Sequence, residues 1–229
     1  NFTDFAPLEE EVGTTVRYIK AGEEIGRPDL VILPGSKNTI ADLEWLVKQG
    51  YKEQIQKLAA AGVEIIGICG GYQMLGTTIF DPQQLESDKD QITGLGLLNL
   101  TTTLQPQKVT TQVHGKVINQ QHIFGQLEAE QLSGYEIHMG QTELKSGVQP
   151  LFEVVEENDD QSTVEYLDGA INQAGTVWGT YLHGIFANDQ LRWQLINYLR
   201  DKKGLACQDF SQEKTTLEKQ ESALKRLAE

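Results

Sequence analysis

The stretch EIIGICGGYQMLG, residues 64–76, places a cysteine between a hydrophobic run and a group of glycines. This pattern predicts a buried strand, a tight turn at Cys69 and a helix that starts directly after it. A side chain at such a turn needs very small neighbours, and Gly67, Gly70 and Gly71 meet that need at positions −2, +1 and +2. We therefore expect Cys69 at the carboxyl end of a strand, with its sulfur presented to a substrate.

A cysteine in this place could act as a nucleophile. The N-terminus of the following helix favours a negatively charged thiolate, and the backbone N–H groups of residues 70 and 71 could stabilise an oxyanion on an attacked substrate. The alternative is a buried, inert cysteine, because free cysteines are often buried and glycines also permit close packing. A partner base is needed to decide between the two interpretations.

His183 is the candidate base. It ends the apolar stretch GTYLHGIF, and in a parallel sheet the carboxyl ends of the strands meet at the edge where Cys69 should also emerge. Cysteine–histidine catalysis needs two side chains that are close in space but not in sequence. Gly179 and Gly184, on either side of this strand end, favour a functional His183 over a histidine that merely ends a strand.

The other three histidines indicate no such role. His114 and His122 lie in polar stretches and are interpreted as surface residues, and His138, in GYEIHMG, as a hydrogen-bonded histidine of a sheet or core. No two histidines have the spacing of a metal site, so no metal is expected. PGSKNT (34–39) lacks the pattern of a Walker A loop. We therefore expect no ATP site and no cofactor in this chain, but a tight turn beside Cys69.

Strands and helices are expected to alternate in the first part of the chain. DLVIL (29–33) and VEIIGI (63–68) are predicted to be buried strands, and GYQMLGTTIF (71–80) a helix. This order predicts an α/β fold in which a mostly parallel sheet has helices on both faces.

The segment between these two strands has helical spacing of its apolar residues. Thr39 and Asp42 resemble a capping box, so the helix should start near residue 39. Gly50 should break it, and a second helical piece should run on to Gly62.

From about residue 92 the pattern changes to short stretches of period two, which predict an antiparallel, β-rich insert. The expected strands are LGLLNLTTTLQ, KVTTQVHGKVIN, QHIFGQL, SGYEIHMGQTEL and LFEVVEE. GTVWGTYLHGIF (175–186) should be an apolar strand again, and DQLRWQLINYLRDKKG (189–204) an amphipathic helix. We expect one domain over residues 1–204 and a charged helical tail over 205–229, on the surface or docked to a partner.

Composition restricts the partners and the compartment. Acidic residues outnumber basic ones by 33 to 19, and the net charge of −14 disfavours nucleic acid and anionic membranes. No stretch approaches the roughly 18 apolar residues of a membrane-spanning helix. The two cysteines, Cys69 and Cys207, cannot form a disulfide framework, and a working thiol needs a reducing compartment, so we expect a cytoplasmic protein. The chain begins at Asn1 without a methionine, which suggests a piece of a longer protein.

Five stretches together closely resemble one family. NFTDFAPL, PDLVILPGSKNTIADLEWL, GICGGYQMLG, GYEIHMG and GTYLHGIF resemble, in order and over nearly the whole chain, the glutamine amidotransferase domain of cobyric acid synthases. The resemblance implies a flavodoxin-like α/β domain that hydrolyses glutamine. It also implies that ammonia passes to an ATP-dependent synthetase domain located before Asn1. That domain would use ATP and Mg to amidate carboxylates of adenosylcobyrinic a,c-diamide, on the route to cobalamin.

The resemblance assigns roles to individual residues. Cys69 matches the family's nucleophile and His183 its base. Gln73 matches the glutamine of C-x-G-x-Q, which helps to hold the substrate, while Gly35 and the N–H of Gly70 match the oxyanion donors. With the neighbouring N–H of residue 71, the expected substrate-binding residues are Gly35, Gly70, Gly71 and Gln73.

One departure concerns the third catalytic group. Many related amidotransferases carry His-x-Glu, whose acid orients the imidazole, but here the run is His183-Gly184-Ile185. Cobyric acid synthases resemble this chain in that respect, so activity is still expected. Glu136 or Asp168 are candidates for the missing acid, and a carbonyl or a water molecule could orient the ring equally well.

Three other functions remain open. The glutaminase subunit of a lipid II amidating complex shares CGGYQ and GTYLHG, although NFTDF and PGSKNT favour the cobyric acid synthase family. A cysteine hydrolase of the same fold that acts on peptides should carry its acid elsewhere around the elbow. A non-catalytic binding module on this fold is the alternative from a different class.

Overall fold

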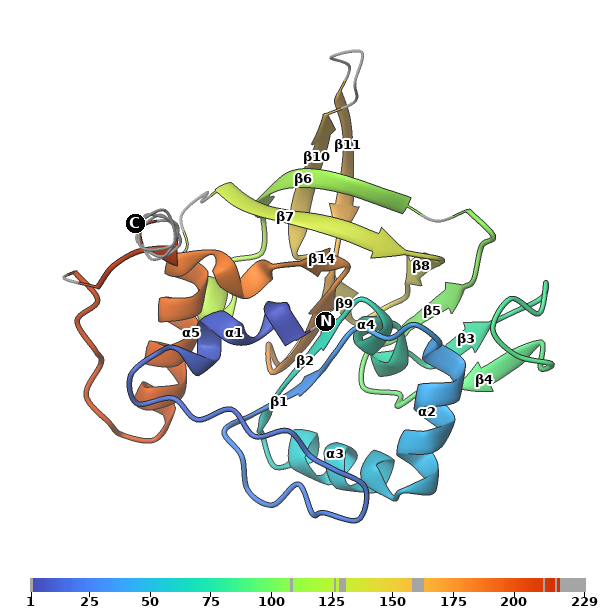
Figure 1. Cartoon of the computed structure of the whole chain (residues 1–229), viewed down its shortest axis with the longest axis horizontal. Helices are drawn as coiled ribbons and strands as arrows, with labels where there is room; N and C mark the ends of the chain where they lie inside the picture. Colours follow the sequence, from blue (N-terminus) through green and yellow to red (C-terminus); the bar gives the residue numbers. More distant parts are fainter. Residues whose placement is uncertain are drawn as a thin grey trace, which may run out of the picture.

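A central five-stranded sheet with helices on both faces organises the molecule (Figure 1). The computed structural model describes residues 2–107, 109–125, 127, 131–157, 163–211, 213–216 and 218. The strands of the central sheet, in spatial order, are β1 (Leu30–Leu33), β2 (Glu64–Ile68), β13 (Val177–Thr180), β12 (Ala170–Asn172) and β9 (Val148–Gln149). β1, β2 and β13 are parallel, whereas β12 and β9 are antiparallel additions at one edge. The expected α/β class is therefore confirmed.

The two faces of the sheet are covered by different helices. One face carries α2 (Thr39–Lys48), α3 (Tyr51–Ala60) and α4 (Gly70–Leu75), and the other carries α1 (Ala6–Glu9) and α5 (Asp189–Lys202). Because side chains alternate along a strand, Ile66 and Ile68 of β2 pack towards α1 and α5, and Ile65 packs towards α2 and α3. Each face of the sheet thus has its own hydrophobic core.

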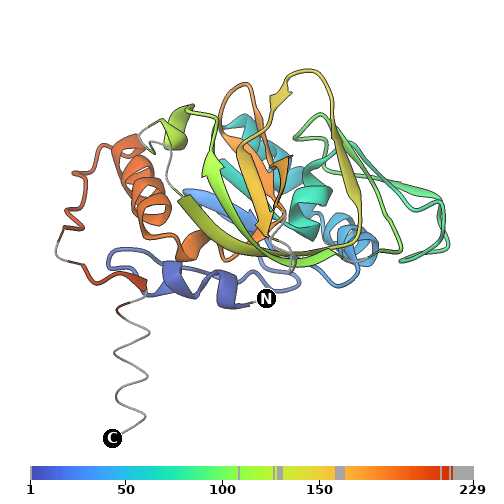
Figure 2. The same cartoon turned by 90° about the horizontal axis from the view of Figure 1, so that it is seen from above.

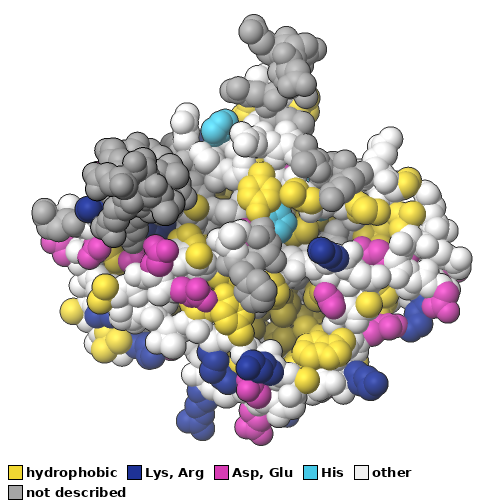
Figure 3. Space-filling model, in the orientation of Figure 1, with side chains coloured by type: hydrophobic (Ala, Val, Ile, Leu, Met, Phe, Trp, Pro, Cys, Tyr) yellow, Lys and Arg dark blue, Asp and Glu magenta, His cyan; other side chains and the backbone are white. Residues whose placement is uncertain are grey.

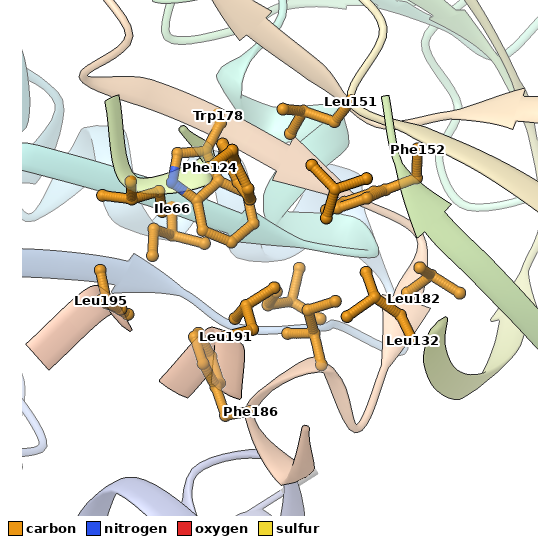
Figure 4. Packing of buried hydrophobic residues seen from close by; sticks show 14 of the residues in the cluster. Ile66, Phe124, Leu132, Leu151, Phe152, Trp178, Leu182, Phe186, Leu191 and Leu195 are labelled. Carbon is orange, nitrogen blue, oxygen red and sulfur yellow. The ribbon is translucent and has the colours of Figure 1, made fainter. Parts of the chain in front are cut away.

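The core under α5 also joins the central sheet to the β-rich part of the chain. Trp178 of β13 packs edge-on against Phe124, at 5.2 Å between ring centroids, and Phe124 packs in the same way against Phe152 (Figure 4). Leu191 and Leu195 of α5 close this cluster from the helix side.

Two further sheets form the β-rich part. The strands of the second sheet, in spatial order, are β11 (Thr163–Asp168), β10 (Phe152–Glu157), β6 (Val109–Val117), β7 (Gln131–His138) and β14 (Leu182–His183). Those of the third are β4 (Gln91–Thr93), β3 (Thr78–Phe80), β5 (Leu100–Thr103) and β8 (Gln141–Leu144). All neighbours in the second sheet are antiparallel, which confirms the expected insert. Short 3₁₀ helices are η1 (Phe2–Asp4), η2 (His122–Phe124) and η3 (Ile185–Ala187).

Five predicted elements differ in the structure. SGYEIHMGQTEL, expected to be one strand, forms the end of β7 in the second sheet and β8 in the third. QHIFGQL contains η2, and its described residues form no strand. The helix after Cys69 ends at Leu75, because Gly76 is followed by the β-branched run that forms β3. The cap of α2 is Asn38, whose side chain accepts a hydrogen bond from the N–H of Ala41, and not Thr39. The single strand expected over 175–186 is two strands in two different sheets.

The N-terminal segment lies outside the sheets. It runs along one side of the molecule, past α5, with its first residues beside β14 (Figures 1 and 2). Most of the helical tail expected over 205–229 falls outside the described residues, so its helical character stays a prediction.

Candidate functional site

Cys69 lies at a strained turn between β2 and α4. Its backbone angles are φ 52° and ψ −110°, a conformation that L-residues rarely adopt. Such a backbone costs about 1–3 kcal/mol and persists only where the surroundings impose it. The hydrogen bond from its N–H to the carbonyl of Thr180, at 2.8 Å, ties the turn to β13. The expected tight turn at Cys69 is confirmed.

The glycines around this turn allow backbones to touch. A Cβ at Gly71 would lie 2.6 Å from the carbonyl carbon of Leu33 in β1, and one at Gly67 would lie 2.7 Å from the carbonyl carbon of Gly71. Real Cβ atoms do not approach other atoms so closely, so β1, β2 and α4 can pack at this distance only because both residues are glycines. This packing holds Cys69 at the end of the parallel strands.

His183 reaches the same place because the chain changes sheets. β13 ends at Thr180, and after one residue the chain enters the second sheet as β14, where His183 pairs with Tyr135 of β7. The imidazole lies beside the side chain of Cys69, close enough for the two groups to interact electrostatically. Gly35 follows β1 against both groups: a Cβ there would lie 3.0 Å from Cε1 of His183 and 3.6 Å from Cβ of Cys69. The structure therefore brings Cys69, His183 and Gly35 together.

Asp4 is the acid that contacts the histidine. The Nδ1 of His183 donates to Oδ2 of Asp4 over 2.8 Å, and the N–H of Gly184 donates to Oδ1 over 3.0 Å. Asp4 is only 2% exposed although it belongs to a short 3₁₀ turn at the edge of the molecule. Sequence reasoning missed it because 179 residues separate the two side chains. The only signal was NFTDF itself, an acid between two phenylalanines in a stretch that carried the family resemblance.

These contacts decide the charge of the imidazole. Burial lowers the pKa of His183, but hydrogen bonds to Asp4 and Cys69 and the negative charges of both raise it, and the net result is a pKa of about 9. A histidine with this pKa is protonated at neutral pH. The arrangement thus places an imidazolium, which can act as a proton donor, beside the side chain of Cys69.

Glu136 and Asp168 are not the third group, and these two predictions were wrong. Oε2 of Glu136 lies 3.0 Å from Nε2 of His138, and Asp168 accepts hydrogen bonds from the hydroxyl of Thr180 and the N–H of Tyr181. Burial and the charge of Glu136 raise the pKa of Asp168 to about 6. Glu136 and His138 share one face of β7, whereas the ring of Tyr135 stacks on His183. The alternation of side chains along β7 therefore separates Glu136 from the imidazole, and the hydrogen bonds of Asp168 are made with Thr180 and Tyr181 instead.

The backbone of β7 contributes a contact that the sequence did not indicate. The thiol of Cys69 lies 3.2 Å from the carbonyl oxygen of Ile137 and donates to it. The ring of Tyr135 lies parallel to that of His183 at 5.1 Å between centroids. GYEIHMG thus forms one wall of the site, and His138 is a hydrogen-bonded histidine of the sheet, as predicted.

Gln73 lies one helical turn after Cys69 and is 2% exposed. Its amide accepts from the hydroxyl of Thr39 at 3.1 Å and donates to the hydroxyl of Tyr181 at 3.2 Å and the carbonyl of Met139 at 3.4 Å. These bonds tie α4 to α2 and to the β-rich part. Substrate binding by Gln73 stays a prediction.

The backbone donors expected for an oxyanion are available. Among the described residues, the N–H groups of Gly35 and Gly70 have no hydrogen-bond acceptor within the protein. Gly70 directly follows Cys69, and a Cβ on it would lie 3.0 Å from the backbone nitrogen of Ser36. The turn after β1 and the start of α4 therefore lie side by side at the thiol, as an oxyanion pocket requires.

Hydrophobic, histidine and basic side chains lie together in the middle of Figure 3. The N-terminus, α4 and β14 come together in the middle of Figure 1. At the same place in Figure 3, hydrophobic side chains predominate among the coloured atoms, while charged side chains of both signs lie mainly around the lower half.

Within the described ranges, no three His, Cys, Asp or Glu side chains form a group that could hold a metal ion. In the part of the chain that the structure describes, no helix is both long and apolar enough to cross a bilayer.

Comparison with known proteins identifies relatives over most of the chain. Residues 1–191 match the CobB/CobQ-like glutamine amidotransferase domain. Two proteins named cobyric acid synthase, from Moorella thermoacetica and Streptococcus sanguinis, are 49% and 48% identical to this chain over 205 residues. Each match covers 90% of this chain but 39% of the relative, so the chain spans about two fifths of the length of these curated relatives.

Solved structures share the fold. One chain of PurLQS from Thermotoga maritima superposes with a TM-score of 0.62 at 20% identity, over 87% of this chain and 93% of that one. A structure described as a glutamine amidotransferase gives a TM-score of 0.56 at 15% identity, over 90% of this chain and 95% of that one. At such identities the likeness concerns the fold alone.

Proposed function

This chain belongs to the CobB/CobQ-like glutamine amidotransferase family, and from that premise we propose that it is the glutaminase half of a cobyric acid synthase. It is a glutamine amidotransferase by family. The observation that supports its catalytic competence is the geometry at one sheet edge, where the thiol of Cys69, the imidazole of His183 and the carboxylate of Asp4 form a continuous chain of contacts.

The proposed mechanism uses these groups in order. The thiolate of Cys69 attacks the side-chain carbonyl carbon of glutamine, and the resulting oxyanion accepts hydrogen bonds from the N–H groups of Gly35 and Gly70. The carbon–nitrogen bond then breaks, and the imidazolium of His183 gives its proton to the departing nitrogen, which leaves as ammonia. The neutral imidazole next takes a proton from water, whose oxygen attacks the thioester. Glutamate is released and the thiolate is regenerated.

In our proposal, Asp4 supports the catalytic role of His183 in two ways. Its contact with Nδ1 keeps the ring in the tautomer whose Nε2 serves the reaction, and its charge stabilises the imidazolium. The thiol of Cys69 must stay reduced, so a reducing compartment such as the cytoplasm is part of the same proposal.

The destination of the ammonia rests on the relatives. Because the chain spans only 39% of the cobyric acid synthases that it matches, we propose that a synthetase domain belongs to the same enzyme. That domain would use ATP and Mg to amidate corrin carboxylates with the ammonia. Glutamine is the proposed partner of this chain, and the corrin contacts the synthetase domain.

Substitution of the nucleophile tests the proposal. In the intact enzyme, Cys69→Ala should abolish glutamine hydrolysis and glutamine-dependent amidation, while amidation with free ammonium should persist because only the ammonia source is lost. Glutamate release and amidated product are measured separately. Cys207→Ala, at an exposed cysteine, is the matched control and should leave both activities unchanged. Glutamine-dependent amidation by Cys69→Ala would refute the assignment.

A further inference from the structure

Arg192 of α5 is a fully buried arginine. It contacts Glu11, which lies farther along the N-terminal segment that also carries Asp4. Arg192 belongs to the first turn of α5 and is 0% exposed, and all three nitrogen atoms of its guanidinium donate hydrogen bonds. Its Nε donates to Glu11 over 2.8 Å and its Nη2 to Asp189 over 2.6 Å. Its Nη1 donates to the carbonyl of Phe186 over 2.7 Å and to the hydroxyl of Thr216 over 3.2 Å.

Two of these partners lie on either side of the contact between Asp4 and His183. Glu11 is seven residues after Asp4 in the N-terminal segment, and it also accepts from the indole N–H of Trp193. Phe186 belongs to η3, the turn that directly follows Gly184, whose N–H donates to Asp4. A single guanidinium therefore joins the segment that supplies Asp4 to the turn that Asp4 must reach.

Apolar packing also fastens the N-terminal segment near its start. Phe5 packs against Phe186 at 6.3 Å between ring centroids, and Leu8 enters the core under α5. No residue of the segment pairs with a described strand, so no sheet ladder fixes its position. Directional bonds are needed to place a carboxylate to within a few tenths of an ångström, and the charge-assisted pair of Glu11 and Arg192 provides them.

We propose that Arg192 is a positioning residue of the glutaminase reaction, which holds Asp4 on Nδ1 of His183 by clamping Glu11 to the turn at Phe186. This inference rests on the proposed function. Arg192 itself contacts neither the thiol nor the imidazole, and its effect on the reaction passes through Asp4.

The pH profile of glutamine hydrolysis distinguishes a positioning role of Arg192 from a purely structural one. The titratable groups in contact with His183 among the described residues are Asp4, Cys69 and Tyr135. When Asp4 no longer contacts Nδ1 of His183, the pKa of the imidazolium falls. The alkaline limb of kcat/KM therefore moves to lower pH. Loss of folded protein alone lowers the amplitude of the profile and leaves its limbs in place.

We therefore expect Arg192→Met, in the intact enzyme, to shift the alkaline limb of glutamine hydrolysis to lower pH and to reduce kcat/KM at pH 8 by about tenfold or more. Arg192→Met combined with Asp4→Asn should show no further shift beyond Asp4→Asn alone. Arg200→Met is the matched control, because Arg200 lies on the same helix and donates to Ala206; its profile should equal that of the wild type.

If Arg192→Met does not fold, Glu11→Gln tests the same proposal. Glutamine keeps the shape of the Glu11 side chain and one acceptor oxygen but removes its negative charge. This variant should shift the limb in the same direction by a smaller amount. An unshifted limb in the folded variants, or additive shifts in the double variant, would overturn the proposal. Survival of glutamine hydrolysis in Cys69→Ala would instead refute the proposed function.

Discussion

The imidazole of His183 is held by side chains from three remote parts of the chain. Asp4 contacts Nδ1, Tyr135 covers a ring face, and Cys69 lies beside the ring. Burial alone would keep such a ring neutral, yet its pKa is raised to about 9 because two negative partners outweigh the loss of hydration. A base in this state can serve as the general acid that amide cleavage needs.

Removal of the Asp4 charge should therefore alter both rate and pH dependence. In Asp4→Asn, the imidazolium loses a charged partner, so the pKa of His183 falls and the alkaline limb of kcat/KM moves down from about 9. We expect kcat to fall roughly 10- to 1000-fold. The profile of glutamate release between pH 6 and 10 measures both effects.

The control for this substitution is Glu10→Gln, an exposed acid in the same segment. It should change neither limb nor rate. If Asp4→Asn kept the wild-type profile, Asp4 would have no part in setting the charge of His183.

At the scale of elements, the site depends on how closely β1, β2 and α4 approach. At Gly67 and Gly71, a side chain would hold the helix away from the strands. The strained backbone of Cys69 is maintained by this packing and by the hydrogen bond to Thr180. Nucleophile geometry and local stability are thus properties of the same contacts.

Gly71→Ala should separate these elements. The new methyl group would collide with the carbonyl group of Leu33, and backbone cannot move aside as a flexible side chain can. We expect a loss of unfolding free energy of roughly 3 kcal/mol or more, together with loss of glutamine hydrolysis. Urea unfolding measures the first effect and glutamate release the second.

Gly62→Ala is the control for Gly71→Ala, because it distinguishes the effect of a steric collision from that of an unfavourable backbone conformation. Gly62 has φ +82° and open space around its missing Cβ, so only the left-handed backbone opposes a side chain there. The expected cost is about 1 kcal/mol, with activity retained. Equal losses in the two variants would show that close packing at Gly71 is unimportant.

At the scale of the whole molecule, the contact of Asp4 with His183 closes the chain on itself. It joins two residues that are 179 positions apart in the sequence, beside the hydrophobic core that holds Phe5 and Leu8. The energy of this contact is therefore part of the folding energy, and it depends on the proton carried by His183.

The Cys69→Ala variant isolates that dependence, because only Asp4 then raises the pKa of the imidazole. A histidine with a raised pKa in the folded state stabilises the fold fully below its unfolded value of 6.5, and the stabilisation is lost as pH rises through the folded pKa. We expect the unfolding free energy of Cys69→Ala to decline by on the order of 1–2 kcal/mol between about pH 6.5 and 9. Denaturant titrations across this range measure the decline.

The double variant Cys69→Ala/Asp4→Asn should show a much flatter dependence over the same range, since its imidazole has lost both partners that raise the pKa. An equally steep decline in both variants would show that other groups are responsible.

The sequence by itself determined the α/β class, the elbow at Cys69 and the pairing of Cys69 with His183. Each depends on local patterns, namely apolar runs, glycine spacing and the rule that parallel strands present their carboxyl ends at one edge. The acid on His183 was decided only by tertiary structure, because nothing local relates Asp4 to a residue 179 positions away. The same holds for the change of sheet after Thr180, which depends on the presence of β7 as a partner for β14. Strand alternation then placed Glu136 on the face of β7 away from the imidazole, and that geometry has no signature in the sequence alone.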